Sequence, residues 1–213
     1  MLNSSSKSHQ RVWNKVGERV RRDFLLQAAA GMLPGVAVQR IHGVNPAVAS
    51  VRTPIWPGAG QYPYFQDARS VQIVSDSIND TNQGTGAWVV RLIGLDDSHE
   101  VQLEDITLRG TRPVISQGDY THVYAAVILR SATRIGLDGV LTLTDRRDSN
   151  ILGYVTSDSN RMENGLLTVP AHTNAYLFDI HFDVDSVQTI QIGVRYTTPV
   201  EDDETWVSLY DDQ

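Results

Sequence analysis

From Ser70 onward, apolar and polar residues alternate in short runs, and turn-forming residues separate these runs every 8–15 residues. An alternation with a period of two places apolar side chains on one face of an extended strand, whereas an amphipathic helix needs a period near 3.6. Short alternating runs with regular turns are typical of two packed antiparallel sheets. This feature therefore predicts an all-β body, a β-sandwich of jelly-roll type with about nine or ten short strands.

The alternation also predicts where the strands lie. The expected strands are Val71–Ile73, Ala87–Leu95, Val101–Leu108, Val123–Leu129, Val140–Leu143, Ile151–Val155, Leu166–Val169, Tyr176–Phe182 and Ile190–Tyr196. The run from Ala87 is apolar on both faces, which is typical of a covered central strand. The phase slips by one residue at Glu104-Asp105, which predicts a β-bulge there.

The first 33 residues follow a helical pattern instead. A helix is expected from about Ser8 to Ala30, because Gly31 and Pro34 then give a stop signal. Its apolar residues recur near every fourth position and form one stripe. The stripe consists of Val12, Trp13, Val16, Val20 and Phe24.

Residues 34–69 form a second segment that is rich in proline and glycine. Five prolines between residues 34 and 66 exclude a long helix and a central strand. The segment also carries large apolar side chains, including Trp56 and Tyr64, which a solvated linker does not need. We therefore interpret the chain as a helical anchor (1–33), an extended arm used in assembly (34–69) and a β-sandwich domain (70–213).

Charge is distributed unevenly along the chain. Residues 1–55 hold eight basic and two acidic residues, a net charge of +6, while the remaining residues hold 10 basic and 23 acidic residues, a net charge of −13. A basic arm on an acidic body indicates a partner for the arm, such as nucleic acid, an acidic protein surface or the body of a neighbouring copy. The alternative is a solvated basic helix face. The acidic C-terminal segment Val200–Gln213 also carries Trp206 and Tyr210, which favours a last strand or a docking tail.

These patterns identify candidate partner-binding residues. The apolar stripe is expected to be buried against another chain, with Trp13 as the anchor, because a helix tethered by a proline-rich segment gains most by docking elsewhere. The basic residues away from the stripe, Lys15, Arg19 and Arg22, are expected to face acidic groups or nucleic acid. Trp56 and Tyr64 would also need partners, which predicts a trimer or a larger ring.

The sequence contains no catalytic motif that indicates a reaction. The chain has no cysteine, which excludes a thiolate metal site and a cysteine nucleophile. Neither a Gly-x-Ser-x-Gly elbow, a His-Glu-x-x-His pair nor a phosphate-binding Gly-rich loop is present. Without a run of about 18 apolar residues, no membrane-spanning helix is expected. We therefore expect no enzyme activity, no cofactor and no membrane partner.

Three groups of polar residues are candidates for metal-binding or catalytic sites. Asp179, His181 and Asp183 share one strand face and could bind a divalent metal, but this is also the expected solvent face. The loop with Asp76, Asp80 and Asn82 fails the calcium-loop pattern, since Arg91 stands where its final Glu would fall. The carboxylates near the expected 95–101 turn could serve sugar hydrolysis, but solvent-facing residues explain them equally well; they are Asp96, Asp97, Glu100, Glu104 and Asp105. We expect no metal site.

Ser70–Thr144 carries a recurring punctuation of turns. It includes Gly84-Thr85-Gly86-Ala87, then Gly94-Leu95-Asp96, then Ile106-Thr107-Leu108-Arg109-Gly110. This region, about a third of the chain, resembles small β-sandwich structural proteins of tailed-bacteriophage particles, and it departs from their pattern at Ser98 and Arg109. The resemblance implies a non-enzymatic virion component: a head-decoration, neck or collar, or fibre-attachment protein. Its partners would be other virion proteins and copies of itself, with nucleic acid contacted only through the basic arm.

A second interpretation concerns export. Arg21-Arg22-Asp23-Phe24-Leu25 resembles a twin-arginine signal, which would be removed in the mature protein. The chain would then be an exported carbohydrate-binding or carbohydrate-active β-sandwich. The apolar stretch after the arginines is interrupted by Gln27, Gly31 and Pro34, which counts against a signal.

Overall fold

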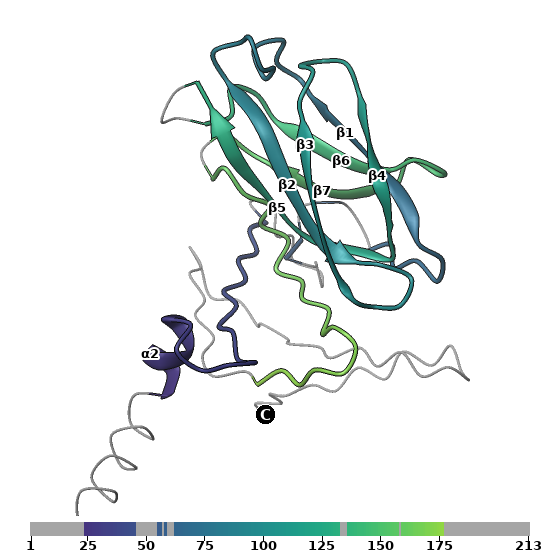
Figure 1. Cartoon of the computed structure of the whole chain (residues 1–213). Helices are drawn as coiled ribbons and strands as arrows, with labels where there is room; N and C mark the ends of the chain where they lie inside the picture. The colour runs from purple at the N-terminus through teal and green to yellow at the C-terminus, as the bar shows by residue number, and fades with distance from the viewer. Residues whose placement is uncertain are drawn as a thin grey trace, which may run out of the picture. The chain divides into compact units, whose positions relative to one another are not determined.

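A computed structural model describes residues 24–45, 55–56, 58, 62–132, 136–157 and 159–176. The chain divides into two compact units, Met1–Thr173 and Asn174–Gln213. Of the second unit, only residues 174–176 are described. The strands and the core that the structure describes belong to the first unit, and Figure 1 shows them within the whole chain.

Within the described residues, seven strands form two antiparallel sheets (Figure 1). The four-stranded sheet has the order β4 (Val114–Tyr120), β1 (Arg69–Ser75), β6 (Leu141–Asp145), β7 (Ile151–Val155). The three-stranded sheet has the order β3 (Val101–Thr107), β2 (Ala87–Leu95), β5 (His122–Ser131). Every paired strand is antiparallel. The all-β prediction is confirmed, and β2 is the central strand of its sheet, as its apolar faces predicted.

The core consists of inward-facing side chains from both sheets. In β1 and β6, every second residue is buried, as a period of two requires. The most deeply buried large side chains are Tyr120, Ile73, Leu92, Leu95, Leu108, Leu137, Leu141, Leu143 and Leu152. Each buried aliphatic side chain of this size stabilises the fold by about 2 kcal/mol. Because these core side chains supply the stabilisation, the turns between the strands can be polar.

Strand β4 was not predicted from the sequence, because the two inward positions in its middle are not apolar. Ser116 faces inward, and its hydroxyl accepts a hydrogen bond from Val71 N at 2.8 Å. Gly118 occupies the next inward-phase position, where an added Cβ would lie 2.3 Å from the Gln102 amide. A strand whose inner face carries a hydroxyl and a glycine shows no apolar alternation.

The predicted β-bulge at Glu104-Asp105 is wrong. Strands β2 and β3 pair in unbroken register from Val89 opposite Thr107 to Leu95 opposite Val101. The apparent slip arises because Val101 and Leu103 face outward, with exposed fractions of 47% and 59%. The inward-facing positions of β3 that precede Ile106 are instead occupied by polar residues.

One expected strand is absent, and three expected elements lie wholly or partly outside the described residues. Residues 166–169 form no strand; the chain there is extended and joins the fold through the neighbouring isolated bridge between Gly43 and Asn164. Helix α2 spans Phe24–Ala29, within the helix expected from Ser8 to Ala30, while residues 8–23 lie outside the described part. The expected strands at 176–182 and 190–196 also lie outside it, Tyr176 excepted.

The sides of the sandwich are closed by different means. On one side, residues 160–162 link the two sheets: Met162 bridges β7 at Val155, and Met162 N donates to the β5 carbonyl of Ala126 at 2.8 Å. On the other side, the Glu104 carboxylate of β3 accepts hydrogen bonds from the β4 backbone, at 2.8 Å from Gln117 N and 3.1 Å from Gly118 N. A side chain thus satisfies backbone donors that a neighbouring strand would otherwise satisfy.

One end of the sandwich is organised around Asp80, which is fully buried. Its carboxylate accepts a hydrogen bond from Ser75 Oγ at 2.5 Å and from Ala87 N at 2.8 Å. It also accepts hydrogen bonds from Asp138 N at 2.9 Å and Gly139 N at 3.1 Å. One carboxylate therefore joins the end of β1, the start of β2 and the loop before β6.

We predict that Asp80→Ala lowers the free energy of unfolding by about 3 kcal/mol or more, because it leaves several buried donors unsatisfied. Urea unfolding followed by circular dichroism measures this loss. Asp97→Ala, at an exposed acidic residue of the β2–β3 turn, is the matched control and should change stability by less than about 0.5 kcal/mol. Equal effects of the two substitutions would contradict the role assigned to Asp80.

Candidate functional site

The arm meets the body through a short antiparallel pairing. Val44 N donates to Glu163 O at 3.2 Å, and Gly165 N donates to His42 O at 2.7 Å. Gly43 and Gly165 lie where the two segments cross closely: a Cβ on Gly43 would be 2.8 Å from Gly165 Cα. Gly165 also has a φ of +67°, a backbone conformation that glycine adopts without strain.

An aromatic cluster holds residues 56–64 of the arm against β5. The Tyr62 ring packs edge-on against Trp56, with 5.1 Å between centroids, and against His122, with 5.0 Å. Tyr64 lies 5.0 Å from Tyr62 and 5.5 Å from His122. The Tyr62 hydroxyl donates to the backbone oxygen of Val123 at 3.2 Å, and burial raises the pKa of Tyr62. The cluster thus anchors the arm within its own chain.

This arrangement differs from the expectation for Trp56 and Tyr64. Both were expected to need partners from another chain, but Trp56 is only 4% exposed and packs on Tyr62, while Tyr64 is partly buried beside His122. The physical reason is that the arm folds back onto β5, so the body supplies an aromatic surface. Phe24 remains 38% exposed at the start of α2. The other predicted partner-binding residues lie outside the described residues; they are Val12, Trp13, Lys15, Val16, Arg19, Val20 and Arg22.

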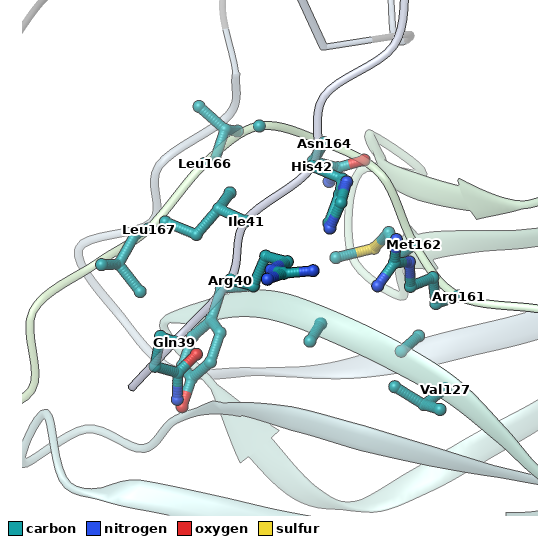
Figure 2. A pocket seen from close by; sticks show the side chains of 14 residues that line it. Gln39, Arg40, Ile41, His42, Val127, Arg161, Met162, Asn164, Leu166 and Leu167 are labelled. Atoms are coloured by element: carbon teal, nitrogen blue, oxygen red, sulfur yellow. The ribbon is translucent and has the colours of Figure 1, made fainter. Parts of the chain in front are cut away.

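Between the arm, β5 and residues 161–167 lies a hollow of about 160 Å³ (Figure 2). Its walls come from residues 39–42, 124–127, 161–162 and 164–167. Figure 2 shows the nitrogen-bearing ends of Arg40 and Arg161 in the hollow, together with the His42 ring. Sites for drug-sized ligands usually measure about 300–1,000 Å³, so this hollow suits a single side chain or a small ion.

The described lining of the hollow has positively charged side chains, and it has polar atoms without hydrogen-bond partners. Arg161 Nε lies 3.6 Å from Glu163 Oε1, but Glu163 is not part of the wall, and the wall residues that the structure describes include no acidic residue. His42 Nε2 and Asn164 Oδ1 are buried and lack hydrogen-bond partners among the described residues. The Asn164 amide nitrogen is already used, since it donates to Leu152 O at 2.7 Å. Two cations and two unpaired polar atoms therefore surround one small space.

The carboxylates considered for sugar hydrolysis serve the fold where their contacts are described. Asp96 Oδ1 accepts two backbone hydrogen bonds, at 2.9 and 3.0 Å, that shape the β2–β3 turn. Asp105 forms a two-point ion pair with Arg91, at 2.6 and 2.9 Å, and these hydrogen bonds lower the pKa of Asp105. Glu104 is engaged by β4. No pair among Asp96, Glu104 and Asp105 is left to act as acid and base.

Two other sequence candidates can also be placed. The loop considered for calcium contains Asp80, whose carboxylate is occupied by the hydrogen bonds described above, while Asp76 Oδ1 accepts from Val140 N at 2.7 Å. Within the described ranges, no three His, Cys, Asp or Glu side chains form a group that could hold a metal ion. Asp179, His181 and Asp183 lie outside those ranges. No helix of the described chain has the length and apolar character needed to cross a membrane.

The arm also carries a series of exposed apolar side chains. Seven large apolar side chains described between residues 24 and 44 are at least 38% exposed. They are Phe24 38%, Leu26 71%, Met32 69%, Val36 39%, Val38 52%, Ile41 43% and Val44 50%. Exposed apolar residues that follow one another along a segment indicate a surface for a partner. The arm was predicted to be such a surface, but of these residues only Phe24 was among the predicted partner-binding residues.

Arg40, His42, Arg161 and Asn164 were not found by the sequence analysis, because they match no motif and lie far apart in the chain. No protein-family model, no curated protein and no solved structure matches this chain. Function must therefore be argued from the arm, the hollow and the charges around them.

Buried His122 makes stability depend on pH. Its ring is 4% exposed, Nδ1 is hydrogen-bonded to Thr168 Oγ1, and burial lowers the pKa of His122 to about 4. The unfolded chain, with a histidine pKa near 6.5, binds the proton first as pH falls. Stability is therefore fully present above about pH 6.5 and is lost toward pH 4, by up to about 3 kcal/mol.

We predict that His122→Gln removes much of this pH dependence even if it lowers stability at pH 7. Chemical denaturation at pH 7.0, 6.0, 5.0 and 4.5 measures the slope for each variant, with the pH values chosen around the range above. His99→Asn, at an exposed turn residue with φ of 58°, is the control and should keep the wild-type slope. An unchanged slope in His122→Gln would show that other groups cause the acid sensitivity.

Proposed function

We propose that this protein is a non-enzymatic structural component of a tailed-bacteriophage virion, attached to the particle by its N-terminal arm. Its place would be head decoration, the neck or collar, or fibre attachment. The proposal includes a jelly-roll-type body and a trimer or larger ring, with other virion proteins as partners and nucleic acid contacted only through the basic arm.

The exposed apolar residues of the arm are the observation that supports this proposal most. Leu26 and Met32 are 71% and 69% exposed, while the core residues of the body are almost fully buried. Ordering such side chains in water stabilises nothing, whereas burying them against a neighbour contributes roughly 1.5–3 kcal/mol each. An arm that is pinned to its own body at 42–44 and apolar beyond that point suits attachment to an assembly.

The turn chemistry gives the second support. The glycines in the motifs on which the resemblance to phage particle proteins rests are required by close contacts: a Cβ on Gly84 would lie 2.0 Å from Asn79 O, and one on Gly86 would lie 2.1 Å from Asp80 Oδ1. Gly110 has a φ of +63°. These residues shape turns and carry out no chemistry, which agrees with a structural role.

Purified particles test the proposal directly. We predict that mass spectrometry of particles detects the protein, and that a chain lacking residues 1–33 stays folded by circular dichroism but is absent from particles. Truncation leaves the described strands intact, since all of them begin after residue 68. Absence of the full-length protein from particles would exclude a virion role.

We further predict that replacing exposed arm residues weakens attachment without unfolding the body. The combined variant Leu26→Ser, Met32→Ser, Val38→Ser should lose at least tenfold in particle incorporation, because three apolar contacts are removed. Its melting temperature should match the wild type, since these residues are exposed. Ile78→Ser is the control, because Ile78 is 74% exposed on a body loop; equal incorporation of both variants would argue against the arm.

A further inference from the structure

The hollow between the arm and β5 has the features of a binding site that the assembly role does not use. Arg40 and Arg161 reach into it from segments more than a hundred residues apart in the sequence, and none of the described residues that line it is acidic. Both arginines are exposed. Arg161 pairs with Glu163 at 3.6 Å, and Arg40 has no ion-pair partner among the described residues. Two guanidinium groups at one hollow offer an anion several charge-assisted hydrogen bonds.

The rest of the lining limits what the anion can be. Ile41, Val127, Leu166 and Leu167 supply apolar surface beside the guanidinium groups (Figure 2). A bound group that matches both surfaces carries a short aliphatic chain with a charged end. The volume of about 160 Å³ fits one such side chain.

The charge of the body argues for a carboxylate over a nucleic-acid phosphate. Residues 56–173, which with the arm form the unit that holds the hollow, contain 9 basic and 14 acidic residues, a net charge of −5 that repels a polyanion. A single carboxylate experiences this repulsion much less, and guanidinium groups bind it with charge-assisted hydrogen bonds. His42 Nε2, buried and unpaired among the described residues, can add a donor when its proton lies on that nitrogen.

We propose that this hollow is a recognition site for a glutamate side chain presented by a partner protein. The glutamate carboxylate binds Arg40 and Arg161, with His42 beside it, and the methylene groups contact Ile41, Leu166 and Leu167. The site depends on the pairing of residues 42–44 with 163–165, which brings the two arginines together. It does not depend on where in a particle, or in which assembly, the partner lies.

Butyrate tests the site in the full-length protein, because it reproduces the glutamate side chain without a partner. In nuclear magnetic resonance titrations, butyrate should shift the amide signals of Gly165 and Arg40 with saturation, and the neutral analogue butyramide should not. Arg40→Gln and Arg161→Gln should each weaken butyrate binding roughly tenfold, the effect of losing one charge-assisted hydrogen bond. Arg112→Gln, at an exposed arginine of the β3–β4 loop, is the control and should bind as the wild type.

Three results would overturn the proposal: equal binding of butyrate and butyramide, equal affinities in the Arg40→Gln and Arg112→Gln variants, or tighter binding of inorganic phosphate than of butyrate at the same signals. The last result would indicate a phosphate site. Melting temperatures of all variants show whether a loss of binding reflects unfolding; if Arg161→Gln unfolds, Arg40→Gln decides the question, because Arg40 lies in the arm outside the sheets.

Discussion

The buried carboxylate of Asp80 is the interaction on which the arrangement of the sheets depends. Its oxygens accept hydrogen bonds from Ser75, Ala87, Asp138 and Gly139, which belong to segments of both sheets. A buried carboxylate is tolerated only when donors surround it, and here three of the four are backbone N–H groups. The same contacts satisfy loop donors that would otherwise be buried and unpaired. Gly86 must be a glycine because the carboxylate occupies the space of a side chain.

The remaining edges are closed by single residues and short segments. Glu104 satisfies backbone donors of β4, and residues 160–162 link β5 to β7. Asp145 organises the β6–β7 turn: burial acts to raise its pKa, but hydrogen bonds from the backbone N–H groups of 147, 148 and 150 overcome this, and the pKa is lowered. With its edges occupied in this way, the body presents few unpaired strand groups to a neighbour.

The proposed interactions involve the arm and the surface where it joins the body. The aromatic cluster around Tyr62 and His122 attaches residues 56–64 to β5, and the pairing of 42–44 with 163–165 places residues 39–42 beside that strand. One consequence is the hollow with Arg40 and Arg161; another is that the apolar side chains of 24–38 project from a fixed point. Both features are proposed here as surfaces for partners, whereas the described contacts of Asp96, Glu104 and Asp105 serve the fold.

The sequence by itself determined the all-β body, because a period of two can bury apolar residues only in strands, and it located six of the seven described strands. It could not reveal β4, whose inward Ser116 is polar, or the outward direction of Val101 and Leu103. It identified the arm but not its return onto β5, which depends on contacts between Tyr62 and residues some 60 positions away. The hollow was decided by tertiary structure alone, since Arg40 and Arg161 become neighbours only when residues 42–44 pair with 163–165.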